Sequence, residues 1–85
     1  MSEQKKDTFF VYTKKDCGFC HRAIKLIKDK GLHHIHMDMT ENEELLKKIQ
    51  EELNWKTVPI IFKFSYRDQV FIGGFTDLCD LLETK

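Results

Sequence analysis

The pattern of apolar and polar positions predicts a regular alternation of strands and helices. Residues 8–13 are expected to form a strand, and their apolar side chains stand at consecutive positions. Consecutive apolar positions are typical of a strand buried on both faces. Residues 18–30 are expected to form a helix that ends before Gly31, because their apolar residues repeat at spacings of three and four. Those apolar residues are Ala23, Ile24, Leu26 and Ile27.

Residues 33–39 alternate and predict a second strand, followed by a helix that reaches about residue 53. In the strand, His34 and His36 share one face, and the apolar residues share the other. Two histidines on one face could bind a metal, but a solvated edge strand is the simpler interpretation. Thr40 and Glu43 have the spacing of an N-terminal capping box for the helix. The helix is expected to bury Leu45, Leu46, Ile49 and Leu53.

The last third of the chain predicts a hairpin and a short helix. Residues 58–64 form the first strand, which the only proline opens, and residues 69–72 return after a turn at 65–68. Gly73 and Gly74 break the strand before a helix at residues 75–82. The order β-α-β-α-β-β-α predicts an α/β fold with a four-stranded mixed sheet flanked by three helices. Its first two strands should be parallel and its last two antiparallel.

Composition narrows the class of protein. Eighty-five residues make one domain, and 14 basic and 14 acidic side chains balance to zero net charge. Nucleic-acid or membrane-surface binding usually requires a basic excess, so neither is expected. Residues 1–7 are polar and are expected to form a flexible tail rather than a signal peptide. Three cysteines do not make a secreted disulfide framework, and we expect a cytoplasmic protein.

Cys17 and Cys20 are the strongest chemical signal, since they follow a predicted strand and open a predicted helix. Helix N–H groups, the helix dipole and Lys14 would favour a thiolate there. The pair could be a redox dithiol, half of a zinc site or, with His21, a c-type haem attachment motif. Zinc would need a second ligand pair, which the sequence lacks, and haem attachment would need export. The redox dithiol is favoured, and no metal site is predicted.

Three motifs in order resemble the glutaredoxins, which have the thioredoxin fold. They are Lys14-x-x-Cys17-x-x-Cys20, Thr57-Val58-Pro59 and Gly73-Gly74-Phe75-Thr76-Asp77, and the resemblance spans residues 8–82. It implies a glutathione-dependent enzyme that reduces protein disulfides and protein–glutathione mixed disulfides. Cys17 would be the nucleophile and Cys20 the resolving thiol. We expect a monomer whose partners are glutathione and disulfide-bonded or glutathionylated proteins.

The resemblance also implies a glutathione site. Lys14 and Lys56 would meet the glycine carboxylate, and the backbone of Val58, before a cis-proline, would pair with the cysteinyl part. The start of the last helix would hold the γ-glutamyl end, with its amine on Asp77, although Thr76 and Asp77 could also simply cap that helix. The implied set is Lys14, Phe19, Lys56, Thr57, Val58, Pro59, Gly74, Phe75, Thr76 and Asp77. A small anion with carboxylates at both ends requires such cations and a helix N-terminus.

One departure from the family pattern supports a second hypothesis. Gly18-Phe19 is similar to the Cys-Gly-Phe-Ser motif of the monothiol branch, which handles iron–sulfur clusters. Trp55, two residues before Thr57, is also similar to that branch. However, Cys20 is present, and the branch's insertion before the active cysteine is missing. The alternative is a carrier in which two Cys17 thiolates and two glutathiones bridge a [2Fe–2S] cluster between two copies. Cys79 is expected to have no catalytic role.

Overall fold

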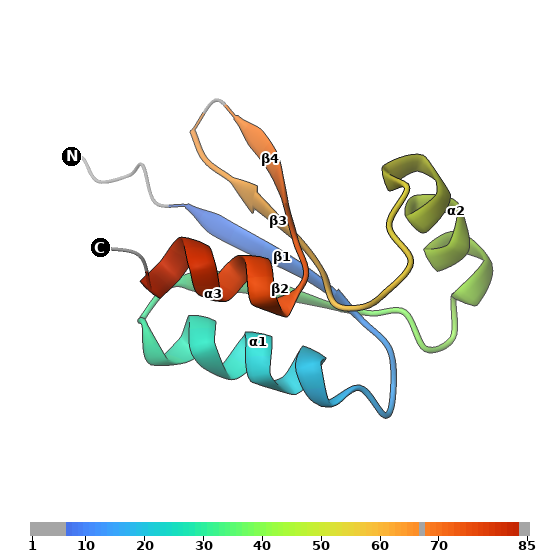
Figure 1. Cartoon of the computed structure of the whole chain (residues 1–85), viewed down its shortest axis with the longest axis horizontal. Coiled ribbons are helices and arrows are strands. Elements are labelled where there is room, and N and C mark those ends of the chain that lie inside the picture. Colours follow the sequence, from blue (N-terminus) through green and yellow to red (C-terminus); the bar gives the residue numbers. More distant parts are fainter. Residues whose placement is uncertain (1–6, 67, 84–85) are drawn as a thin grey trace.

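The computed structural model describes residues 7–66 and 68–83 and contains the predicted four-stranded mixed sheet with three helices (Figure 1). The strand order is β2-β1-β3-β4, in which β1 is parallel to β2 and antiparallel to β3, and β3 is antiparallel to β4. Residues 1–6 of the predicted tail, and Arg67 of the predicted turn, lie outside the described residues. The elements are β1 (Thr8–Thr13), α1 (Gly18–Asp29), β2 (His33–Asp38), α2 (Glu43–Leu53), β3 (Ile60–Phe64), β4 (Gln69–Gly73) and α3 (Phe75–Glu83).

One face of the sheet is covered by α1 and α3, which lie side by side in Figure 1. Ala23 and Ile27 of α1 are one helical turn apart, and both are fully buried. The apolar stripe predicted for this helix therefore faces the sheet. Full burial of an aliphatic side chain such as Ile27 contributes ~1.5–3 kcal/mol. The buried cluster consists of Phe9, Val11, Ala23, Ile27, Ile61 and Leu78.

Among the described helices, α2 is the one that packs on the opposite face, at one end of the sheet (Figure 1). Leu46 of α2 packs with Met39 and Ile60, and all three are buried. The rest of this face carries half-buried aromatic rings, among which Phe10 and Phe64 have centroids 4.5 Å apart. β1 is therefore fully buried on the α1 side and half-buried on the other, so the predicted burial on both faces is only partly correct.

Several predicted apolar positions remain exposed because α2 does not lie over the whole sheet. Leu45 was expected in the core, but its exposed fraction is 50%. Ile35 and Met37 lie on the edge strand β2 with exposed fractions of 43% and 37%. The prediction of a solvated edge strand at β2 is confirmed.

Two predicted boundaries were wrong. The strand expected at residues 58–64 begins only at Ile60, because Val58 and Pro59 form a loop. The helix expected to begin at Thr40 begins at Glu43, with Asn42 as its N-cap and no capping hydrogen bond from the Asn42 side chain. The Thr40 hydroxyl bonds to Asp38 and to the backbone of Lys15 instead. Thr40 therefore stabilises the turn between β2 and α2 rather than capping the helix.

Candidate active site

Cys17 lies where β1 gives way to α1, and it is the N-cap residue of that helix. Its backbone is extended, at φ −119° and ψ 101°, and its Sγ accepts a hydrogen bond from the Cys20 N–H at 3.1 Å. The first turn of α1 contains no acidic side chain. The sulfur therefore meets unpaired N–H groups and the uncompensated positive end of the helix dipole, both of which favour a thiolate.

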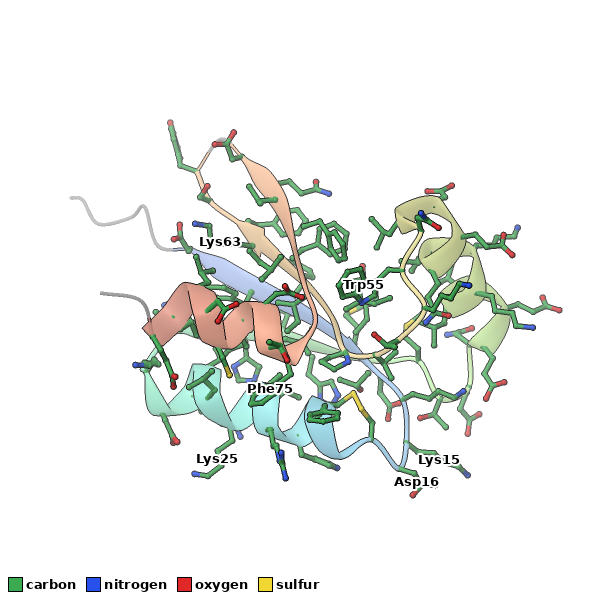
Figure 2. The ribbon with its side chains drawn as sticks, in the orientation of Figure 1. Lys15, Asp16, Lys25, Trp55, Lys63 and Phe75 are labelled. Atoms are coloured by element: carbon green, nitrogen blue, oxygen red, sulfur yellow. A yellow bond between two sulfur atoms is a disulfide. The ribbon has the colours of Figure 1, made fainter. Side chains whose placement is uncertain are left out.

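Cys17 and Cys20 form a disulfide in this structure, with their Cα atoms 5.3 Å apart. Cys17 is half-buried, whereas Cys20 has an exposed fraction of only 2%. Only the first sulfur is open to a bulky substrate. The redox interpretation of the pair is supported by this disulfide. Figure 2 shows the disulfide at the start of α1, near the turn that carries Lys15 and Asp16.

A second loop, which leads into β3, lies beside Cys17. The Val58–Pro59 peptide bond is cis, as the resemblance implied. The carbonyl oxygen of Val58 lies 3.8 Å from Cys17 Sγ. The side chain of Gln50, near the end of α2, donates to the carbonyl of Thr57 at 3.3 Å and ties this loop to the helix. The backbone of Val58 therefore lies directly beside the reactive sulfur.

The third part of the site is the start of α3. Gly73 has φ 123°, which favours glycine, and a side chain there would overlap the Asp77 carboxylate. The Gly74 N–H donates to Asp77 Oδ2 at 3.0 Å, so Asp77 caps its own helix. A Cβ on Gly74 would lie 3.5 Å from the ring of Trp55. The two glycines thus let the chain pass closely between Asp77 and Trp55.

A pocket of about 340 Å³ lies among these three segments. This volume is within the range of small-molecule sites. The pocket brings together the residues that the sequence predicted for glutathione, except Lys14 and Lys56. It is lined by Phe19, Trp55, Thr57, Val58, Pro59, Gly74, Phe75, Thr76 and Asp77.

The two predicted cations lie outside the pocket lining. Lys14 is exposed and has its Nζ 3.9 Å from a carboxylate oxygen of Glu43, the first residue of α2. This exposed pair is weak, because such pairs contribute ~0–1 kcal/mol. Lys56 is exposed and directly precedes Thr57 of the pocket. Either ammonium could meet a ligand that extends beyond the rim.

Trp55 lines the pocket but was not among the residues predicted to bind glutathione. Its ring meets Phe71 edge-to-face, with centroids 5.3 Å apart. Its indole Nε1 is buried, and no hydrogen-bond partner for it lies among residues 7–66 and 68–83. The signal that could have identified it is its position, two residues before Thr57. A large aromatic residue next to a binding loop often forms its wall.

Phe19 forms the exposed aromatic edge of the site. Its exposed fraction is 55%, and its ring stacks on that of Phe75 with centroids 5.8 Å apart. The Arg22 guanidinium lies 5.5 Å from the centroid of Phe19, within cation–π range. A flat apolar surface therefore stands between the pocket and solvent on the Cys20 side.

Titratable groups elsewhere differ from Cys17 in their surroundings. Partial burial, and then the carboxylates of Glu83 and Asp80, raise the pKa of the Cys79 thiol. Burial, and then the positive charge of Lys28, lower the pKa of His34. His36 Nε2 lies 2.6 Å from the Thr13 hydroxyl. In the described parts of the chain, no group of three or more His, Cys, Asp or Glu residues could hold a metal ion.

Comparison with known proteins identifies the family. The glutaredoxin family model matches residues 9–64. Glutaredoxin 3 of Escherichia coli is 34% identical over 80% of this chain and 77% of its own length, and Glutaredoxin 1 of Rickettsia conorii is 33% identical over 87% and 71%. The solution structure of a glutaredoxin from Brucella melitensis has a TM-score of 0.70 at 26% identity, covering 95% of this chain and 83% of that one.

Two further observations complete the comparison. The glutaredoxin-like NrdH-redoxin of Escherichia coli has a TM-score of 0.62 at 16% identity, covering 82% of this chain and 86% of its own, and supports the thioredoxin-like fold alone. Within residues 7–66 and 68–83, no helix is long and apolar enough to cross a bilayer. With a Cys17–Cys20 disulfide at the start of a helix and a cis-proline loop beside it, the chain belongs to the glutaredoxin family and is a thioredoxin-fold redox protein.

Proposed function

We propose that this protein is a glutathione-dependent thiol–disulfide oxidoreductase that acts as a cytoplasmic monomer. Its substrates are protein disulfides and protein–glutathione mixed disulfides. The observation that supports this most is the pocket beside Cys17, which combines the Val58 backbone, the α3 N-terminus and Asp77. A peptide bound through its backbone would extend along Val58, with its own sulfur next to Cys17.

The α3 end of the pocket suits the γ-glutamyl end of glutathione. The γ-glutamyl end carries a carboxylate and an ammonium. The N–H groups of the first turn of α3 suit the carboxylate. Asp77 uses Oδ2 to accept from Gly74. Its second oxygen, Oδ1, would accept from the ammonium. Capping the helix and binding the amine are therefore compatible roles for Asp77.

The glycine carboxylate at the other end would meet Lys56 or Lys14. Lys56 precedes the pocket residue Thr57 and is exposed. Lys14 would have to exchange Glu43 for the ligand, at little cost, because that pair is long and exposed.

The reaction proceeds by two exchanges. The Cys17 thiolate attacks the glutathione sulfur of a mixed disulfide, forms a Cys17–glutathione bond and releases the protein as a thiolate. A second glutathione thiolate attacks the glutathione sulfur of this intermediate, which yields oxidised glutathione and frees Cys17. With a protein disulfide, the Cys17 thiolate attacks one of its sulfurs, forms a Cys17–protein mixed disulfide and releases the other protein sulfur as a thiolate. Cys20 then attacks Cys17 Sγ and releases the second protein sulfur as a thiolate, and the product is the Cys17–Cys20 disulfide seen here. Two glutathione molecules then reduce that disulfide.

The test compares a glutathionylated peptide with a neutral small disulfide, using glutathione and its reductase to follow turnover. Lys56→Gln should lower kcat/KM for the glutathionylated peptide about three- to tenfold, which is ~0.7–1.4 kcal/mol. Lys25→Gln is the matched control, because Lys25 is exposed on α1 and pairs with Asp29. Absence of turnover with glutathione contradicts the proposal. A brown protein with cluster absorbance after anaerobic purification would favour the [2Fe–2S] carrier instead.

A further inference from the structure

The turn that follows β2 is bonded to the turn that presents Cys17. The backbone N–H of Lys15 donates to Thr40 Oγ1 at 3.0 Å. The Thr40 hydroxyl donates to Asp38 Oδ1 at 2.6 Å, and the Thr40 N–H donates to the same oxygen at 3.0 Å. A hydroxyl has one proton. With that proton committed to Asp38, Thr40 presents a lone pair to Lys15.

This contact holds a strained part of the active-site turn. Asp16, between Lys15 and Cys17, has φ 60°, in the left-handed region. This conformation costs energy for residues other than glycine, although Asp adopts it more readily than most. Two neighbouring contacts fix it here. On one side is the hydrogen bond from Lys15 to Thr40. On the other is Cys17, whose sulfur caps α1.

A backbone hydrogen bond also joins the residues that lead into these two turns. The Met39 N–H donates to the Thr13 carbonyl at 2.8 Å, which extends the pairing of β1 and β2 by one residue beyond β2. Thr13 precedes the Cys17 turn directly, and Met39 precedes Thr40 directly. The Lys14–Glu43 pair joins the same two segments at the surface. Three contacts of different kinds therefore connect the β2–α2 junction to the nucleophile turn.

We propose that Thr40, oriented by Asp38, is a positioning residue for the reactive cysteine. It holds the Lys15–Asp16 turn so that Cys17 Sγ stays aligned with the N–H groups of α1. The inference rests on the proposed role of Cys17 as the attacking thiol. It does not require that glutathione be the reductant. Thr40 does not touch the sulfur, so its loss should weaken thiolate stabilisation without removing the chemistry.

The test measures Cys17 alone, in reduced protein carrying Cys20→Ser and Cys79→Ser. Thr40→Val removes the hydroxyl and keeps the shape, whereas Thr40→Ser keeps the hydroxyl. Asp38→Asn keeps an acceptor and removes the charge. The readouts are the thiolate absorbance against pH, the rate of alkylation by iodoacetamide at neutral pH, and the melting temperature. Neither chemical readout uses glutathione, so failure here and failure of the proposed function can be told apart.

Thr40→Val should raise the pKa of Cys17 and slow alkylation about three- to tenfold, a size expected for one lost hydrogen bond. Thr40→Ser should restore the rate to within about twofold of the parent. Asp38→Asn should fall between them. An unchanged rate in Thr40→Val overturns the proposal, as does an equal loss in Thr40→Val and Thr40→Ser. If Thr40→Val does not fold, Asp38→Asn and Thr40→Ser decide: equal alkylation rates in these two overturn it.

Discussion

The two helices that begin at the pocket differ in what occupies their first turn. α1 begins at the sulfur of Cys17 and has no acidic side chain in its first turn. α3 begins at Phe75 and has Asp77 in its first turn, where the Asp77 carboxylate accepts the Gly74 N–H. The field at the start of α1 is therefore free to act on the sulfur. That of α3 is partly compensated by a permanent anion.

This difference suits the start of α1 to reactivity and the start of α3 to recognition. At α1 the anion that satisfies the helix is the Cys17 thiolate, the proposed nucleophile, and it is present only when Cys17 is reduced. At α3 the anion never leaves, so that end contributes shape, hydrogen bonds and a fixed negative charge. A site that accepts a zwitterionic peptide benefits from both, since the ligand brings a disulfide to one helix and an amine to the other.

The largest expected effect is the loss of Cys17 itself. Cys17→Ser should abolish reduction of a glutathionylated peptide, because serine is a far weaker nucleophile at neutral pH. Cys20→Ser should retain it, because that reaction needs one thiol and Cys20 is buried, with an exposed fraction of 2%. Steady-state kcat/KM on the glutathionylated peptide measures both. Comparable losses in the two variants would establish an obligatory dithiol route and contradict the proposed mechanism.

The next prediction makes the first turn of α1 resemble that of α3. A Cβ at Gly18 would meet no heavy atom within 4 Å, so a side chain can be placed there without a clash. Gly18→Asp should raise the pKa of Cys17 by roughly 0.5, which is ~0.7 kcal/mol, within the usual effect of a charge at a helix terminus. Gly18→Asn is the uncharged control. Thiolate absorbance against pH measures both, and equal pKa values in the two variants would mean that the charge has no influence.

The third prediction removes the charge from α3. Asp77→Asn keeps an oxygen that can accept from Gly74. It removes the negative charge proposed to meet the glutathione ammonium. A partly desolvated charge-assisted hydrogen bond is worth about 1.5–3 kcal/mol, so kcat/KM for the glutathionylated peptide should fall several-fold or more. The rate with a neutral disulfide should change little. Equal changes with both substrates would leave Asp77 with the capping role alone.

Much of this arrangement could be predicted from the sequence. Periodicity gave β1 its bounds, and the spacing of Cys17 and Cys20 identified the redox pair, because both signals are local. The three motifs identified the pocket residues only through resemblance. Cys17 and Val58, for example, are 41 residues apart in the sequence, and no local pattern shows that Cys17 Sγ lies 3.8 Å from the Val58 carbonyl oxygen.

The failures occurred where tertiary contacts override local preference. Thr40 and Glu43 have the spacing of a capping box, yet Thr40 bonds to Asp38 and Lys15, which the sequence could not show to be neighbours. Leu45 fits the apolar stripe of α2, but this helix contacts only the end of the sheet and leaves Leu45 half exposed. Hydrophobic periodicity shows that a helix has an apolar face. It does not show how much of that face another element covers.

The smallest expected effect concerns Cys79, a cysteine inside a helix, which can be compared with Cys17 at the start of one. It lies within α3 rather than at its start, so neither unpaired N–H groups nor the dipole assist it. Burial, and then the carboxylates of Glu83 and Asp80, raise the pKa of its thiol. Cys79 should therefore remain protonated at neutral pH. It is also the free thiol of the oxidised protein, so alkylation before reduction reports it separately from Cys17.

We expect slow alkylation of the oxidised protein and fast alkylation after reduction. Cys79→Ser should leave kcat/KM on a glutathionylated peptide close to that of the parent. A fall of more than about tenfold, or ~1.4 kcal/mol, in a variant with an unchanged melting temperature would show that Cys79 takes part in the reaction. Rapid alkylation of the oxidised protein would show that position at the start of a helix is not what distinguishes the reactive cysteine.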